Sequence, residues 1–377
     1  MTRQLGSADV LAHRVAAQQL DRPAADRPVT DADVLDLGVQ DTGRDGASWA
    51  LVNRGVPVCS PDQLAEDDRL ALVWTLRAAP HFYRRADLPD VLVATSPFSD
   101  ADAAKRVIGA DQPLKEAGIS TRDGLAEVAG QLHRLVVEPA VKGDVSTRLS
   151  QVLAPPYLRD CVPCGAVHTW EMPFRLGALY GGLELQPGTS PPVLRRIPHW
   201  SRRTWGPAPD PMAAPARLQV IRGYLRFLGP ATPGEVAGFL GAAVRDVRAN
   251  WPADAVEVAV LGRKAWSLGE PLERSVDEDL VRLLGPYDLL LQAQDRAVVV
   301  PDTSRHRVLW PTLGRPGAVL VGPRIAGVWR PRAAGRRFSV RLDLWSEPGS
   351  AALDRIEEQA HRLAEHRGLT FAGILRD

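Results

Sequence analysis

The chain has 377 residues and a formal net charge of only +1, with 45% hydrophobic and 24% charged residues. These values are typical of a globular protein of two or three domains, and the near-zero net charge excludes a uniformly basic nucleic-acid binder. No stretch approaches the ~18 uninterrupted apolar residues of a membrane span, and residues 1–14 lack the apolar region of a signal peptide. We therefore predict a cytoplasmic protein with no membrane partner.

The first 95 residues carry the signals of a winged helix, in which three helices precede a β-hairpin. Apolar spacing predicts these three helices: 8–20, 31–37 and 48–54. Two β-rich runs, 70–76 and 81–84, predict the hairpin that forms the wing. The wing supplies four candidate DNA contacts: Arg77, His81, Arg84 and Arg85.

Residues 96–216 form a predicted helical region that includes a Pro-rich basic loop. Four helices are expected in it: 99–108, 120–137, 146–153 and 172–183. The segment 195–203 places arginines around Ile197 and Trp200, a mixture suited to phosphate contact and partial wedge insertion into DNA. Its candidate DNA contacts are these: Arg195, Arg196, Arg202 and Arg203.

Cys161, Cys164 and His168 have the spacing of three metal ligands. A closed structural zinc site needs four ligands, and the one remaining cysteine, Cys59, is distant in the sequence. We interpret the two thiols as buried side chains near a turn and predict neither a metal nor a cofactor. A zinc site is the alternative.

The clearest unit of the chain is a second winged helix at 217–268. Thr232 and Glu235 predict a capping box at the start of its second helix, and Gly241 makes the turn into the third. Two β-rich runs close the unit at Leu268 as a wing. DNA binding is the commonest use of this plan, and a structural or protein-contact role is the alternative.

Residues 269–377 are predicted to be β-rich, with helices at 277–284 and 351–367. Five strands are expected between these helices: 289–292, 297–300, 318–321, 325–330 and 338–344. Arginines of this region complete the candidate DNA contacts: Arg330, Arg332 and Arg336. The fold class is therefore mainly α with β wings (α+β), with tandem winged helices (helix-turn-helix motifs) around a small β-rich element.

Four stretches of the chain, 36–50, 217–268, 284–296 and 319–329, carry a family resemblance. They are similar to the bacterial winged-helix DNA-binding proteins that include the AlkZ and YcaQ DNA glycosylases. The resemblance covers nearly the whole length. It implies a C-shaped body with a basic concave face for duplex DNA, and excision of alkylated purines or unhooking of interstrand crosslinks. A non-catalytic DNA-binding protein and a protein-interaction scaffold are the alternatives.

The catalytic signature of that family is a glutamine, an apolar residue, and then a glutamine or aspartate. The resemblance places the first position at Gln40 and the third at Thr42, with Asp41 between them, so this chain departs from the signature at two of three positions. An amide oxygen can orient a water, and a carboxylate can stabilise positive charge. The candidate catalytic set is therefore Gln40 and Thr42 with Asp41 or Asp45, beside Arg44 as a DNA contact.

The local backbone decides whether this set is one site. On a strand, Gln40 and Asp41 point to opposite faces, whereas on a turn they share a site. A capping turn with no catalytic role is the alternative. A second Gln-Ala-Gln at 292–294 is interpreted as strand sequence. We predict a monomeric DNA glycosylase without a cofactor.

Overall fold

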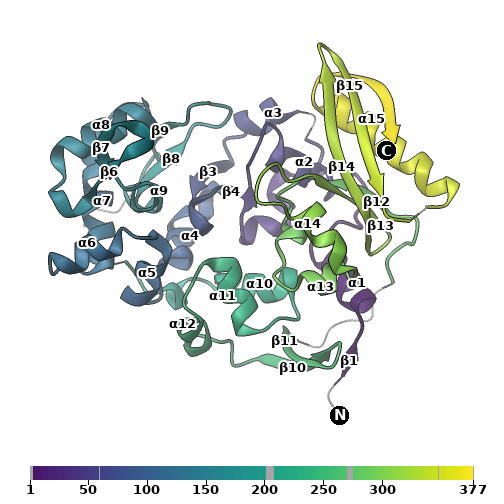
Figure 1. Cartoon of the computed structure of the whole chain (residues 1–377), viewed down its shortest axis with the longest axis horizontal. Coiled ribbons are helices and arrows are strands. Elements are labelled where there is room, and N and C mark those ends of the chain that lie inside the picture. The colour runs from purple at the N-terminus through teal and green to yellow at the C-terminus, as the bar shows by residue number, and fades with distance from the viewer. Residues whose placement is uncertain (1–2, 59, 201–207, 270–274, 347, 377) are drawn as a thin grey trace.

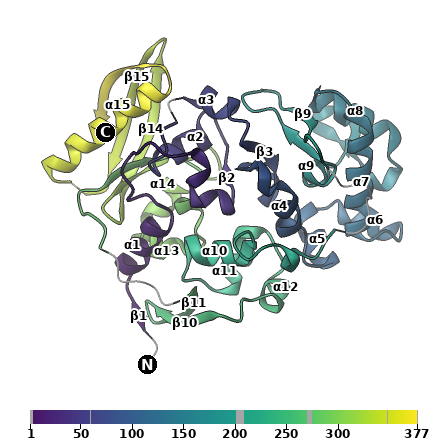
Figure 2. The ribbon, with the colours of Figure 1, turned by 180° about the vertical axis from the view of Figure 1, so that it is seen from behind.

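The structure is a computed structural model that describes residues 3–58, 60–200, 208–269, 275–346 and 348–376. It is a mixed α/β protein in which helices alternate with several mainly antiparallel sheets. Figure 1 shows helices α5–α9 at one side, the strands β12–β15 with α15 at the other, and α10–α12 between them at the bottom. Figure 2 shows the same arrangement from behind.

The N-terminal segment consists of helices and two short strands. Its elements are β1 (Gln4–Leu5), α1 (Ser7–Ala17), η1 (Val29–Asp31), η2 (Asp33–Asp36), β2 (Val39–Gln40), α2 (Gly46–Val52) and α3 (Pro61–Glu66). The helix predicted at 31–37 is wrong as one element, because the extended backbone of Ala32 separates the two 3-10 helices η1 and η2.

The hairpin predicted for the first wing occurs, but it belongs to a larger sheet. Its strands β3 (Leu70–Trp74) and β4 (Pro80–Arg84) are antiparallel and are joined through η3 (Leu76–Ala78). The sheet has the order β2-β4-β3-β8-β9-β5. The other strands are β5 (Ala140–Val141), β8 (Leu183–Leu185) and β9 (Val193–Arg196). Both long edges of the hairpin are therefore paired, and its side chains are largely buried.

Two helices, η4 (Arg85–Asp87) and α4 (Leu88–Thr95), follow the hairpin directly. The helices expected after residue 95 are present. The helices of this region are α5 (Asp100–Val107), α6 (Asp111–Glu116), α7 (Thr121–Leu135), α8 (Lys142–Val152), η5 (Pro155–Tyr157) and α9 (Glu171–Tyr180). A two-stranded hairpin that was not predicted interrupts them. It consists of β6 (Leu158–Cys161), the 3-10 turn η6 (Val162–Cys164) and β7 (Ala166–Thr169).

The element order predicted for 217–268 is found. After η7 (Pro211–Ala213) come α10 (Val220–Leu228), α11 (Pro233–Leu240), α12 (Val244–Ala249), β10 (Ala255–Val260) and β11 (Arg263–Leu268). Thr232 and Glu235 form the capping box, and Gly241 takes the left-handed conformation that ends α11. β10 pairs with β11 and, in parallel, with β1.

The C-terminal region departs from the prediction at three elements. The helix expected at 277–284 is wrong, because β12 (Val281–Leu284) pairs with β13 (Gly317–Val321). The strands expected at 289–292 and 297–300 are wrong, because these residues form short helices. The remaining elements are η8 (Leu289–Gln292), α13 (Arg296–Val299), η9 (Thr303–Arg305), α14 (His306–Leu309), β14 (Arg324–Ala334), β15 (Arg337–Leu344), α15 (Ser350–His366) and β16 (Thr370–Arg376).

One hydrophobic cluster joins the four predicted segments, with members such as Leu11, Leu149, Leu225 and Leu320. Two fully buried ion pairs connect N-terminal helices to the C-terminal segment: Arg14–Asp295 and Arg54–Asp288. Within the described ranges, no helix combines the length and the apolar character needed to cross a bilayer.

Candidate active site and DNA-binding surface

The position of Gln40 is set by a short strand at the edge of the six-stranded sheet. Gln40 pairs with His81, and Val39 with Phe82. Gly38 precedes the strand with φ +89°, and a Cβ there would collide with the ring of Tyr83. Only glycine fits this combination of positive φ and close approach. The pairing with β4 and the close packing of Gly38 against Tyr83 therefore fix the backbone that carries Gln40.

Gln40 and Thr42 lie on the same side of the chain. Nε2 of Gln40 donates a hydrogen bond of 2.9 Å to Oγ1 of Thr42. This pairing follows from the two-residue period of an extended backbone, which turns alternate side chains to one face. The first and third positions of the signature thus contact each other directly.

Arg77 connects this pair to distant parts of the chain. Its Nη2 lies 3.4 Å from Oε1 of Gln40 and donates to Oε1 of Gln292 at 2.5 Å. Its Nη1 donates to the carbonyl oxygen of Phe239 at 2.6 Å, and its guanidinium lies 4.5 Å from the centre of that ring. The interpretation of 292–294 as strand sequence was wrong, because Gln292 ends the 3-10 helix η8 and its side chain lies beside the candidate site.

Arg77 is a largely buried cation held by neutral groups. Burial, together with a smaller effect of the nearby charge of Arg315, lowers its pKa to about 10, so the guanidinium stays charged at neutral pH. None of the ion pairs among the described residues involves Arg77. A buried charge without a counter-ion is costly, and an anionic ligand would relieve this cost.

Two further arginines were missed in the sequence: Arg315, whose charge acts on Arg77, and Arg296, whose pKa is also affected by Arg315. Burial is the main reason that the pKa of Arg77 and of Arg296 is lowered, and the charge of Arg315 adds to the effect on each. The Arg315 guanidinium lies 5.3 Å from the Tyr287 ring centre. These residues come from separate loops and short helices, so no local motif marks them.

Asp41 and Asp45 belong to a different face. Asp41 accepts a hydrogen bond from the Ala47 amide at 3.2 Å, and burial raises its pKa to about 6, with Asp45 adding to the rise. Asp45 forms a two-pronged ion pair with Arg367 at 2.7 and 3.0 Å. The contacts of these carboxylates are thus separate from those of Gln40, as expected for a strand.

This second face opens into a cavity of about 890 Å³. Its lining includes Asp41, Arg44, Arg175 and His366. Ser48 Oγ lies 2.8 Å from Nε2 of His366 at one end of the cavity. Arg44 is exposed at the rim, so it keeps its accessibility as a candidate DNA contact.

The basic residues predicted on the first wing are mostly engaged inside the protein. His81 is 2% exposed, and burial lowers its pKa to about 3, so it is neutral and has little surface for a phosphate. Arg84 pairs with Asp36 at 2.6 Å. Arg85 pairs with Glu184 at 2.8 Å. The expectation that a free wing presents these side chains was wrong, because the hairpin lies inside a sheet.

In the basic segment 195–203, the two arginines that the structure describes also have partners within the protein. Arg195 pairs with Glu184 at 2.8 Å, and Arg196 donates to the carbonyls of Val136 and His133, both at 2.9 Å. Arg202 and Arg203 lie outside the described residues.

The β14–β15 hairpin offers the most accessible of the predicted contacts. Arg330, Arg332 and Arg336 are exposed on it, and Arg337 at the start of β15 is exposed as well. Only backbone carbonyls accept hydrogen bonds from Arg330 and Arg336 within the described part of the chain. Figure 1 shows this hairpin projecting from the body beside α15.

Comparisons with known proteins place this geometry in a family. The model of a family described as AlkZ-like DNA glycosylases matches residues 14–366. The solved structure of DNA glycosylase AlkZ from Streptomyces sahachiroi is similar over 99% of this chain and 100% of its own, with a TM-score of 0.70 and 20% sequence identity. A comparison with curated proteins found no match. The structural likeness shows a shared fold. The matched residues of the family model include both Gln40 and Asp41.

Proposed function

Because the chain belongs to the AlkZ-like DNA glycosylase family, we propose that it excises N7- or N3-alkylated purines from duplex DNA and unhooks crosslinks built on such adducts. A DNA glycosylase hydrolyses the N-glycosidic bond between a base and its sugar. The observation that carries the lesion class is the pairing of Gln40 with Thr42, since the hydrogen-bond partners of these two side chains are an amide, a hydroxyl and a guanidinium.

A site of this composition suits a substrate that is already cationic. An N7- or N3-alkylated purine carries a positive charge, so the base leaves without being protonated by the enzyme. The protein then has to hold the sugar, place a water and stabilise an oxocarbenium-like transition state. Gln40 Oε1 can accept a hydrogen bond from that water, and the Thr42 hydroxyl can donate one to it. We assign the positioning of water to these two side chains.

We propose that Arg77 binds a DNA phosphate next to the lesion. It is a largely buried cation with neutral partners, and it contacts both Gln40 and Gln292. A phosphate would supply the missing counter-charge and would bring the adjacent sugar to Gln40. Asp41 lines the cavity on the second face and has no part in this scheme; it is the alternative general base.

We propose that the rest of the DNA lies along the β14–β15 hairpin and the unit 217–268, acting as a winged helix. Arg245 and Arg248 of α12 are exposed. Replacing both Arg332 and Arg336 by Ala should flatten the plot of log affinity against log salt by about 2, since each phosphate contact contributes ~0.9.

Arg85→Ala is the matched control for that experiment, because the Arg85 guanidinium is held inside the protein by Glu184 and by the carbonyls of Asp68 and Leu70. Its salt slope should equal that of the wild type. Equal slopes for the hairpin variant and the wild type would exclude the hairpin from the interface.

We propose that the enzyme works as a monomer, in the cytoplasm. Light scattering of the protein with and without a ~20-base-pair duplex should give one chain per complex; two chains would contradict this.

The decisive experiment is release of N7-methylguanine from a defined duplex. Gln40→Ala should slow release by ~10²-fold, comparable to the loss of one preorganised polar group, while DNA affinity stays within about twofold of the wild type. Gln112→Ala on α6 is a matched glutamine control and should keep full activity. Uracil, which is a neutral and poorer leaving group, should not be released.

Two outcomes would contradict the proposal. Equal rates for Gln40→Ala and the wild type would move the chemistry away from this face, and Asp41→Asn would then be the next variant to assay. No release by the wild type from methylated or crosslinked duplexes would favour a protein that binds damage without excising it.

A further inference from the structure

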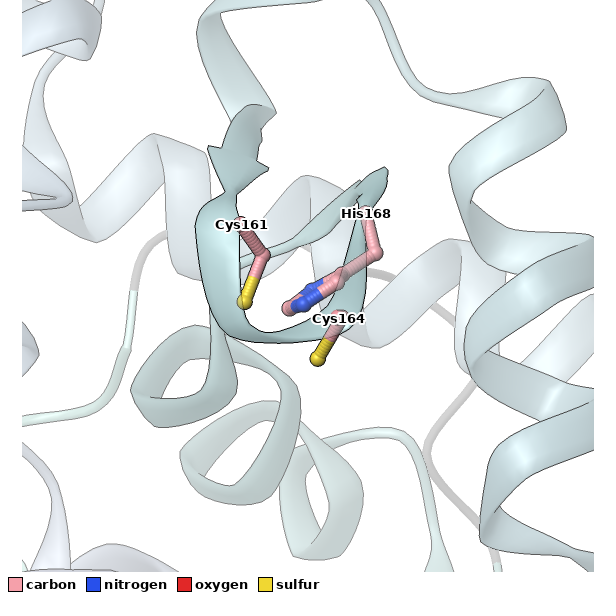
Figure 3. Close-up of side chains that lie close together, drawn as sticks. All are labelled: Cys161, Cys164 and His168. Carbon is pink, nitrogen blue, oxygen red and sulfur yellow. The ribbon is translucent and has the colours of Figure 1, made fainter.

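Three potential metal ligands converge on the β6–β7 hairpin, far in sequence from Gln40. The Sγ atoms of Cys161 and Cys164 and a ring nitrogen of His168 all lie within 4.8 Å of one another. Figure 3 shows the three side chains turned toward one another from the strand ends and the connecting turn. Neither thiol forms a disulfide. The interpretation of both thiols as buried was wrong for Cys164, which is exposed.

The hairpin register explains why these side chains meet. Arg159 pairs with His168, and Cys161 with Ala166, so all four side chains lie on one face of the two-stranded sheet. Ala166 presents only a methyl group opposite Cys161. The face therefore has room for an ion between the thiol and the imidazole.

The turn brings the third ligand back to that face. Gly165 adopts φ +61°, and its amide donates to the carbonyls of Cys161 at 2.9 Å and Val162 at 3.2 Å. The amide of Cys164 also hydrogen-bonds to the sulfur of Cys161. A turn closed by amides around a sulfur holds the two cysteines of a Cys-x-x-Cys pair on the same side, as metal binding requires.

The surroundings orient two of the ligands. Nδ1 of His168 hydrogen-bonds to the carbonyl of Thr169 at 2.7 Å, which fixes the ring and leaves Nε2 for a metal. Arg159 Nη2 donates a hydrogen bond of 3.2 Å to Sγ of Cys161, so a cationic donor lies beside this sulfur. Zinc binds thiolates rather than thiols.

We propose that Cys161, Cys164 and His168 bind one Zn²⁺ ion, with water in the fourth position. Two thiolates and one imidazole form a donor set typical of zinc, and three protein ligands with one open position are a known zinc arrangement. Binding transfers the two thiol protons to solvent and leaves the Cys₂His–zinc unit without net charge. The site is independent of the chemistry at Gln40.

The ion would stabilise the hairpin, because a two-stranded sheet by itself is at best marginally stable in water. The hairpin leads directly into α9. Trp170, the residue before α9, donates from Nε1 to the Leu158 carbonyl at 3.1 Å and lies under the Arg159 guanidinium at 5.4 Å. Arg175 of α9 lines the cavity beside Asp41. Zinc at the hairpin would therefore fix the start of the helix that carries Arg175.

The test is metal analysis of the full chain, purified under reducing, anaerobic conditions and loaded with zinc. The wild type should retain about one zinc per chain after gel filtration, and the double variant Cys161→Ser/Cys164→Ser should retain none. Cys59→Ser is the matched cysteine control and should keep the metal. Cobalt in place of zinc should give thiolate-to-metal charge-transfer absorption and the intense visible bands of tetrahedral coordination.

Two single variants keep the test valid if the double variant folds poorly. Cys164→Ser alters an exposed side chain and should lose zinc while circular dichroism remains unchanged. Arg159→Gln leaves all three ligands and should weaken zinc affinity by about 10–100-fold. A chelator should lower the melting temperature of the wild type but not of Cys164→Ser.

Three results would overturn the proposal. They are a wild type that binds less than stoichiometric zinc, a cobalt spectrum without charge-transfer bands, and zinc retained by the double variant.

Discussion

Replacement of Arg77 by Met tests whether this largely buried cation serves DNA or the fold. Its pKa falls from 12.5 to about 10, mainly because of burial. At 1.36 kcal/mol per pKa unit, the folded protein spends about 3 kcal/mol in keeping this guanidinium charged. Methionine removes that cost. It also removes the hydrogen bonds to Phe239 and Gln292, and bonds from a charged donor are worth about 1.5–3 kcal/mol.

Two such bonds at about 1.5–3 kcal/mol each are only partly offset by the relieved cost of about 3 kcal/mol, so the free energy of unfolding of Arg77→Met should fall by about 0–3 kcal/mol. DNA binding should respond differently. Loss of one phosphate contact should flatten the salt slope by about 0.9. Urea denaturation gives the first quantity, and fluorescence anisotropy with a ~20-base-pair duplex at several salt concentrations gives the second.

Arg54 provides the contrast for this measurement. It is also buried, but it forms two hydrogen bonds, 2.8 and 3.0 Å long, with the carboxylate of Asp288, which is fully buried. Arg54→Met leaves that carboxylate without a counter-ion and should cost about 3–5 kcal/mol. If Arg77→Met loses as much stability as Arg54→Met and keeps the wild-type salt slope, Arg77 is a structural residue and the argument fails.

The second face of β2 gives a pH-dependent prediction. The pKa of Asp41 is raised from 3.8 to about 6 in the folded protein, so its ionisation destabilises the fold as pH rises from about 4 to 6 and the full cost is present above that range. Asp41→Asn should therefore raise the melting temperature at pH 8 and have little effect at pH 4; an equal effect at both values would contradict the assignment. Thr42→Val removes the acceptor of the Gln40 amide and should slow N7-methylguanine release by about 10-fold or more, whereas Thr42→Ser should retain it. Equal rates for the two Thr42 variants would show that the hydroxyl is not needed.

The unit 217–268 could be predicted from sequence because its signals are local. Thr232 and Glu235 satisfy the first amides of α11 within three residues, and Gly241 ends the helix by its own conformation. Such interactions need no distant partner. The short apolar runs after residue 276 lack them, and a run of four to eight apolar residues is compatible with a strand or a helix. Pairing with β13 decides in favour of a strand at Val281–Leu284, and that partner lies in a distant part of the sequence.

Arginine density was a poor guide to accessible charge for the same reason. Arg85 and Arg195 are separated by more than a hundred positions, yet both bind the carboxylate of Glu184. Glu184 lies on the neighbouring strand, 11 residues before Arg195, but it is 99 residues away from Arg85 in the sequence. The arginines of the β14–β15 hairpin stay exposed because a hairpin that projects from the body has few acidic neighbours. Whether an arginine is exposed depends on which acidic side chains the tertiary fold brings close to it.

The candidate site shows most directly what a signature can and cannot indicate. The two-residue spacing of Gln40 and Thr42 places both on one side of a strand, and this much follows from the local backbone. The position of Gln292, 215 residues beyond Arg77, follows only from the packing of η8 against the N-terminal sheet. Arg77 contacts η8, β2 and the end of α11 at once. A change in any of these three segments therefore alters the contacts around Gln40. The chemical environment of the signature residues is thus defined only in the folded chain.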